Sequence, residues 1–139
     1  LKNKVKDFFV RSVQNRDERG FCITQDVMAA LLDKWSLFVV YNLGYYGTLR
    51  FSELKTKIKS ISGRMLSVTL KKLEAHGLIS RRVYPEVPPR VEYQLTDFGQ
   101  ALAGRTIELN AWLLDHYYPT TQTPAPSPVA SKKSPPEKP

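Results

Sequence analysis

The chain contains two adjoining stretches that decide its fold, SGRMLSVTLKKLEAHG at residues 62–77 and RRVYPEVPPRVEY at residues 81–93. In the first stretch, the apolar residues follow the i, i+4, i+7 spacing of a helix with one buried face: they are Leu66, Leu70 and Leu73. Ser62 is typical of a helix N-cap, and Gly77 of a left-handed helix end. In the second, β-branched and aromatic residues flank prolines, which cannot donate hydrogen bonds to a strand ladder. It therefore predicts two strands joined by a stiff turn.

The residues before position 62 complete a pair of consecutive helices. Residues 51–58 place apolar side chains at 51, 54 and 58, which predicts a helix with Ser52 as its N-cap. The turn at residues 59–61 joins this helix to the next, which is the arrangement of a helix-turn-helix.

Helical patterns also lie on both sides of this unit, at residues 1–20, 26–33, 36–45 and 96–118. The third should end at Gly44 or Gly47, and Thr96 should cap the last. Gly99 and Gly104 should weaken the last helix, with a break or kink at Gly104. The expected fold class is mainly α with a small β-hairpin, a winged helix-turn-helix whose terminal helices form a dimer interface.

Length and composition predict one domain with tails. We expect a basic helical N-terminal extension at residues 1–20, a domain for DNA binding and dimerisation at 21–118, and a disordered Pro-rich tail at 119–139. The tail is interpreted as a solvated end, with weak attraction to DNA through its lysines as the alternative. No window has the apolar length of a membrane span, and the single cysteine favours a reducing cytoplasm.

Positive charge is concentrated in the predicted helix-turn-helix and hairpin. Residues 48–90 contain ten Lys or Arg and three Glu, which gives +7 of the chain's net +8. Such a concentration indicates a polyanionic partner, and duplex DNA fits best. The candidate DNA-binding residues are Arg50, Gly63, Arg64, Ser67, Val68, Lys71, Lys72, Arg82 and Arg90.

Helical periodicity assigns different roles to the candidates in residues 62–77. With the leucines on the buried face, the first turns present Gly63, Arg64, Ser67 and Val68 outward, where a recognition helix meets base edges. Lys71 and Lys72 come later and are expected to hold phosphates, while Arg90 at the hairpin tip is expected to reach a minor groove or phosphates. The alternative is an ordinary solvated helix surface, in which the signs of charge would normally alternate.

Several motifs are similar to those of the HxlR-type regulators, bacterial and archaeal relatives of the MarR regulators. The similarity covers about residues 22–115, with LRFSEL at 49–54, ISGRML at 61–66, YPEVPPRVEY at 84–93 and LTDFG at 95–99. The resemblance implies a homodimeric, cytoplasmic transcription factor that binds a palindromic promoter site, with several members sensing electrophiles or oxidants through an N-terminal cysteine. Here Ile23 follows Cys22, where the family often has proline. The N-terminal extension and the tail lie outside the resemblance.

The last predicted helix has more apolar surface than one contact with a core uses. One apolar stripe contains Leu102, Leu109, Leu113 and Tyr117. The other contains Ile107, Ala111, Leu114 and Tyr118, which with Phe8 of the N-terminal extension form the candidate dimer interface. The alternative is that both stripes pack within one subunit.

Cys22 precedes a predicted helix start, and a helix N-terminus lowers the pKa of a thiol. An oxidant or a small electrophile is therefore a candidate partner of Cys22. The alternative is that Cys22 is a buried residue that only fills space.

Other classes of function fit the sequence less well. An enzyme is not expected, since the chain has two histidines, one cysteine, and no metal-ligand spacing, phosphate loop or nucleophile motif. No cofactor, metal or membrane partner is expected. A winged helix used only for protein–protein contact remains the alternative, and it would favour apolar or mixed-sign groups where this chain has Arg64, Lys71 and Lys72.

Overall fold

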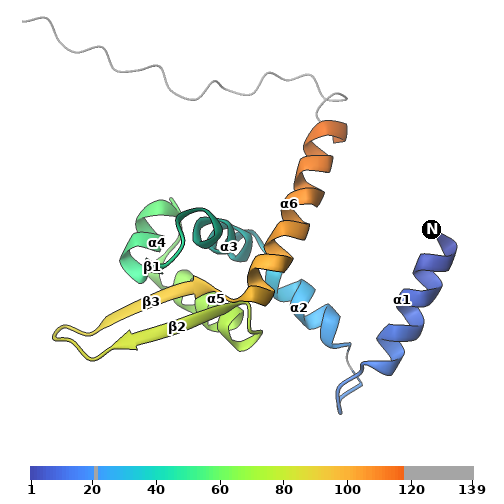
Figure 1. The fold of residues 1–139 in the computed structure, drawn as a ribbon, viewed down its shortest axis with the longest axis horizontal. Helices are drawn as coiled ribbons and strands as arrows, with labels where there is room; N and C mark the ends of the chain where they lie inside the picture. The colour runs from blue at the N-terminus through green and yellow to red at the C-terminus, as the bar shows by residue number, and fades with distance from the viewer. Residues whose placement is uncertain (21, 118–139) are drawn as a thin grey trace, which may run out of the picture. The chain divides into compact units, whose positions relative to one another are not determined.

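The computed structural model describes residues 1–20 and 22–117, and it contains six helices and one small sheet within them (Figure 1). The helices are α1 (Lys2–Gln14), α2 (Ile23–Leu31), α3 (Lys34–Tyr46), α4 (Phe51–Lys57), α5 (Gly63–Ala75) and α6 (Asp97–Tyr117). The strands are β1 (Leu49–Arg50), β2 (Ile79–Tyr84) and β3 (Arg90–Leu95). The prediction of a mainly α fold with a β-hairpin in a winged helix-turn-helix is confirmed.

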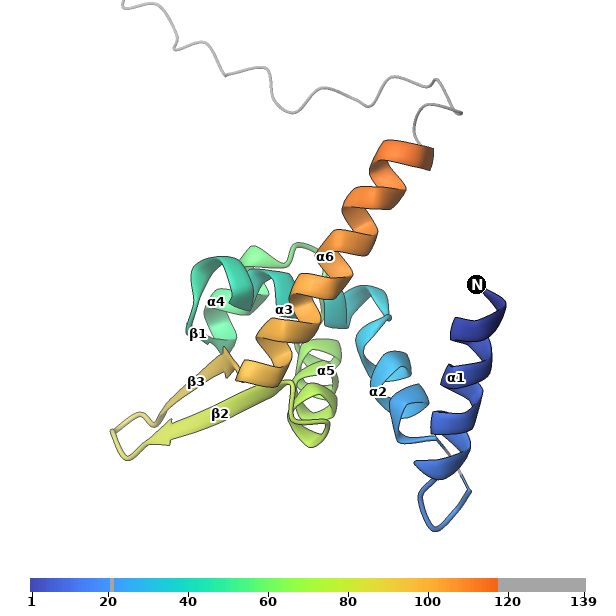
Figure 2. The ribbon, with the colours of Figure 1, turned by 45° about the vertical axis from the view of Figure 1, so that its right-hand side comes forward.

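The sheet is antiparallel in the order β1-β3-β2. The hairpin pairs Ile79 with Leu95 at its base and Tyr84 with Arg90 near its tip. In both views the tip lies clear of α4 and α5, as the wing of a winged helix does (Figures 1 and 2).

β1 was not predicted, and it also corrects the predicted start of α4. Leu49 pairs with Tyr93 and Arg50 with Glu92, so the backbone stays extended up to Arg50. Arg50, not Ser52, is therefore the N-cap, and its backbone N–H donates to Glu53 Oε2 at 2.7 Å. Ser52 lies inside the helix.

The core is formed mainly by helices α3, α4 and α5 and the inner face of the sheet. The three leucines predicted for the buried face of α5 are confirmed there, each at most 2% exposed. They pack in one cluster with Val39 and Leu43 of α3, Leu54 of α4, and Tyr93 of β3. Burial of these side chains fixes which face of α5 points outward.

Other boundaries differ modestly from the sequence-based expectations. α2 begins before the expected 26–33 segment, with Cys22 as its N-cap. α3 begins at Lys34 because Asp33 caps it, and it passes Gly44 to end before Gly47, whose φ is +78°. The expected break at Gly104 is wrong: α6 continues through it, because neighbouring residues keep the helix hydrogen bonds that one glycine only weakens.

The junction between the hairpin and α6 explains Gly99, which the sequence marked only as a weak helix former. Thr96 caps α6: its hydroxyl accepts a hydrogen bond from the Gly99 N–H at 3.0 Å and donates to the Gly77 carbonyl at 2.6 Å. A Cβ on Gly99 would overlap the carbonyl oxygen of Leu78. Glycine is thus required there by close packing.

The described chain divides into two compact units, residues 1–106, which hold the core, and residues 107–117, which form the last turns of α6. Within the described residues, no single helix has the length and apolar character to cross a membrane. α2 and α3 have that length and apolar character only when taken together, and the chain bends by 81° between them.

Candidate nucleic-acid interface

α5 presents one face to the core and a basic face to solvent. Ser62 caps it as predicted, since its hydroxyl accepts from the Met65 N–H at 3.0 Å. Arg64, Val68 and Lys71 are exposed on the outward face, and Ser67 is half-buried. Among the described residues, neither Arg64 nor Lys71 forms an ion pair. Their charges therefore remain available to an external anion.

A lysine of α4 adds to this basic face at the start of α5. Lys55 Nζ lies 3.7 Å from the position that a Cβ on Gly63 would take. The first backbone N–H groups of a helix attract anions, and an ammonium beside them increases that attraction. Gly63 is half-buried there, and Arg50 is exposed at the start of α4.

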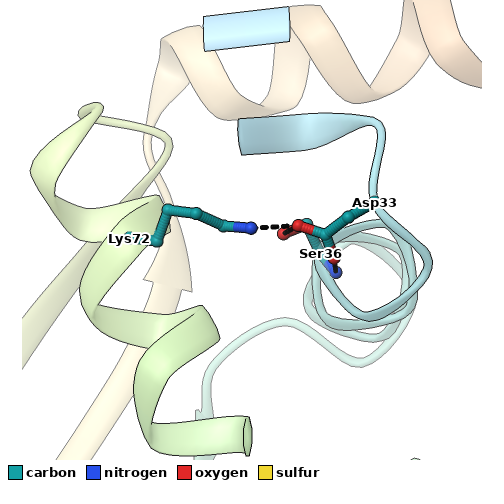
Figure 3. A network of polar contacts seen from close by, with 3 residues as sticks. All are labelled: Asp33, Ser36 and Lys72. Atoms are coloured by element: carbon teal, nitrogen blue, oxygen red, sulfur yellow. Dashed lines mark hydrogen bonds and ion pairs between the residues drawn. The ribbon is translucent and has the colours of Figure 1, made fainter. Parts of the chain in front are cut away.

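Lys72, which the sequence assigned to a phosphate contact, has an acidic partner within the chain. Its ammonium makes an ion pair with Asp33, which lies between α2 and α3 (Figure 3). Ser36 donates both its backbone N–H and its hydroxyl to the same carboxylate, at 2.9 and 2.8 Å. Helical periodicity gives the direction of Lys72 but not the presence of Asp33, a residue 39 positions away.

The ionisation of Asp33 reflects this cluster. Burial raises the pKa of the carboxyl, but the hydrogen bonds from Lys72 and Ser36 outweigh burial, so the pKa lies below its ordinary value. Asp33 therefore stays ionised at neutral pH, and its stabilising contribution would be lost only as the pH falls through that lowered pKa.

On the wing, Arg90, which the sequence assigned to a minor groove or phosphates, also has partners within the chain. The guanidinium lies 3.9 Å from the ring centre of Tyr84 and makes ion pairs with Glu86, at 3.4 Å, and with Glu92, at 3.5 Å. The positive charge of Arg90 is thus partly neutralised, and its contacts stabilise the base of the turn. Arg82 is exposed, with its guanidinium 4.8 Å from the same ring.

Glu92 occupies the centre of a charged row across the outer face of the sheet. Its cross-strand neighbours are Arg50 on β1 and Arg82 on β2. Directly opposed residues of antiparallel strands have side chains on the same face and within reach of each other. Glu92 therefore lies between two basic residues on the same face of the sheet, an arrangement visible only after β1 is placed beside β3.

Cys22 is 5% exposed and lies at the N-cap of α2. Its Sγ lies 2.9 Å from the hydroxyl of Thr24. That hydrogen bond lowers the pKa of the thiol below its ordinary value, helped by the first backbone amides of α2 and opposed by burial. The thiol also borders a surface hollow whose walls include Phe8, Val13 and Arg16.

The candidate dimer residues are exposed where the structure describes them. Ile107, Ala111 and Leu114 on α6 and Phe8 on α1 are all solvent-exposed, the larger three by more than half. In the other stripe, Leu102 is partly buried against the core, whereas Leu109, Leu113 and Tyr117 are exposed. Tyr118 lies outside the described residues.

Sequence reasoning missed Asp33 as the partner of Lys72, and it counted Lys55 in the basic region without placing it at the start of α5. Asp33 precedes an apolar helix, which is a detectable N-cap signal, but its partner on α5 is not detectable from the sequence.

Among the described residues, no group of His, Cys, Asp and Glu is arranged to hold a metal ion.

A helix-turn-helix with a basic outward face, followed by a basic hairpin, defines the class of winged-helix DNA-binding proteins. The sequence profile described as HxlR-like helix-turn-helix matches residues 30–121, about two thirds of the chain. The chain belongs to this family of transcriptional regulators.

Individual relatives agree with this assignment. An uncharacterized HTH-type transcriptional regulator of Methanothermobacter thermautotrophicus is 45% identical over 86 residues, which cover 62% of this chain and 65% of that protein. The chain thus spans slightly less than two thirds of that relative. The family and its members are transcriptional regulators and not enzymes.

Two solved structures are similar in fold. The reduced form of the transcriptional regulator YodB from Bacillus subtilis has a TM-score of 0.62 and 34% identity, covering 68% of this chain and 92% of that one. The redox regulator HypR in its reduced form has a TM-score of 0.60 and 34% identity, covering 68% and 92%.

Proposed function

We propose that this protein is a sequence-specific regulator that binds a palindromic site in double-stranded DNA as a homodimer. The observation that carries the proposal is the outward face of α5, where Arg64 and Lys71 have no ion-pair partner among the described residues. Arg can bond bidentately to guanine, Ser67 supplies a hydroxyl, and Val68 can contact a thymine methyl.

The other basic groups fit a supporting role along the DNA backbone. Lys71 lies later on α5, and Lys55 lies at its N-terminus, where phosphates bind. Arg50 and Arg82 are exposed on β1 and β2, the two strands on either side of β3, and would extend the contact to flanking phosphates. Arg90, already paired with two glutamates, is assigned a role in shaping the wing.

The experiment that tests this proposal selects bound fragments from random duplex DNA and then titrates salt. We expect enrichment of an inverted repeat with half-sites about one helical turn apart. Binding should weaken steeply with salt, because each neutralised phosphate releases counterions. A winged helix used for protein contact would enrich no sequence and show little dependence of DNA binding on salt.

We expect the dimer to depend on the apolar stripe of α6. Replacing both Ile107 and Leu114 with glutamate should weaken self-association at least about tenfold, because the charges would have to be desolvated in the interface. Analytical ultracentrifugation at several micromolar concentrations measures this. Asp115→Asn on the same helix is the control and should leave association unchanged. A wild-type protein that sediments as a monomer at those concentrations would overturn the dimer.

Cys22 is proposed to make DNA binding responsive to oxidants or small electrophiles. The lowered pKa favours the reactive thiolate, the adjoining hollow offers apolar walls, and the similar protein HypR is described as a redox regulator. A reducing cytoplasm would keep the thiol free in the resting state.

We expect a quinone or an oxidant to change operator affinity in the wild type but not in Cys22→Ser. Serine replaces the thiol with a smaller hydroxyl that can still hydrogen-bond to Thr24, so folding should be retained. Alkylation rates measured against pH should give a thiol pKa below about 8.5. Mass spectrometry verifies the modification, and a non-reducing gel distinguishes a disulfide-linked dimer from a mixed disulfide. Unchanged DNA affinity after verified modification would leave Cys22 as a packing residue.

A further inference from the structure

Among the described residues, Lys72 is the one basic candidate on α5 that forms an ion pair with an acidic side chain. The Asp33 carboxylate that holds it is itself fixed, because Ser36 donates two hydrogen bonds to it and Ser36 is fully buried. The acceptor is therefore part of the rigid start of α3. In Figure 3 the Lys72 side chain extends from α5 toward Asp33 and Ser36.

The ion pair is placed where it can set the tilt of α5. Lys72 lies in the last turn of the helix, whereas Arg64 lies in the first, about 12 Å away at 1.5 Å per residue. If α5 rotated by about 5° about its Lys72 end, Arg64 would move by about 1 Å. Displacements of that size exceed the tolerance of about 0.5 Å within which a binding constellation must be held.

Packing of leucines alone leaves this tilt less well defined. Leu66, Leu70 and Leu73 fix the buried face of α5, but apolar contacts are not directional and tolerate small rotations. A hydrogen-bonded ion pair to an anchored carboxylate is directional. It therefore adds an orientational constraint at the end of α5 opposite to Arg64.

We propose that the Lys72–Asp33 ion pair is a positioning device, which sets the angle at which α5 presents Arg64 and Ser67 to DNA bases. This inference rests on the proposed DNA-binding function. In the competing arrangement, Lys72 leaves Asp33 on binding and contacts a phosphate, so that Asp33 acts against DNA binding.

Two substitutions give opposite outcomes under these arrangements. Lys72→Met removes the charge but keeps the aliphatic stem, and Asp33→Asn removes the charge but keeps a good N-cap. If the pair positions α5, each variant should bind the selected operator about fivefold more weakly. The double variant should bind the operator no more weakly than the weaker-binding single variant. The dependence of operator affinity on salt should stay that of the wild type.

Lys71→Met is the matched control, because Lys71 is the exposed neighbour without an ion-pair partner among the described residues. It should weaken operator and random duplex alike and reduce the salt slope by about 0.9. If Lys72→Met behaved as Lys71→Met is expected to, and Asp33→Asn bound DNA more tightly, Lys72 would be a phosphate contact and the proposal would be overturned.

Lys72→Arg supplies a rescue, since it retains the pair with Asp33 and should restore operator affinity to within about twofold of the wild type. Affinities are measured well below the melting temperature of every variant. Variants that melt earlier but bind the operator as the wild type does would show a stabilising role only and overturn the proposal. A wild type that selects no operator would overturn the proposed function and this inference with it. An operator bound equally by the wild type and Asp33→Asn would overturn this inference alone.

Discussion

Replacing Gly99 with alanine is expected to lower the free energy of unfolding by about 3 kcal/mol, at the upper end of the usual cost of overpacking. The added methyl group would overlap the Leu78 carbonyl oxygen and lie 2.9 Å from its carbon. The neighbouring atoms cannot yield easily, because both belong to backbone. The same carbonyl accepts the Thr96 N–H at 3.1 Å, so its displacement would also disturb the cap of α6.

Chemical denaturation with an unchanged m value measures this loss, and the melting temperature should fall by about 10–20 °C. Gly104→Ala on the same helix is the matched control, because no atom lies within 4 Å of its added Cβ. That substitution should stabilise the protein by up to about 1 kcal/mol, the difference in helix propensity between the residues. Equal effects of the two substitutions would contradict the close packing at Gly99.

Arg64→Ala is expected to weaken binding to the selected operator by about 1–3 kcal/mol, roughly 5- to 150-fold, and to relax sequence preference at one position of each half-site. The reason is that Arg64 is exposed in the first turn of α5 without an ion-pair partner among the described residues. Random duplex DNA should lose much less affinity, since base-specific contacts contribute little to it.

Arg64→Lys separates charge from geometry in the same assay. Lysine preserves the positive charge, so the salt slope should stay near that of the wild type, but it cannot reproduce the planar bidentate contact. Operator preference should therefore be lost while binding to random duplex is kept. If Arg64→Ala bound both kinds of DNA as the wild type does, α5 would not be the recognition helix.

The elements that the sequence determined correctly depend on neighbours close in the chain. The leucine stripe of α5, the cap at Ser62 and the stop at Gly77, with φ of +68°, all follow from helical periodicity and local backbone conformation. The prolines of the hairpin likewise restrict the turn locally. The exposure of Arg64, Val68 and Lys71 follows from the same periodicity, because they lie on the face opposite the leucines.

The features decided only by the tertiary structure join residues far apart in sequence. β1 is two residues long and exists because β3 lies beside it, and this pairing makes Arg50 the N-cap of α4 instead of Ser52. The sequence placed Lys72 and Arg90 outward but could not show the carboxylates of Asp33 and Glu92 that hold them. Gly99 resembled a weak point of a helix and is instead the site of a close backbone approach. Periodicity gives the direction of a side chain, whereas the group that it meets depends on how the elements pack.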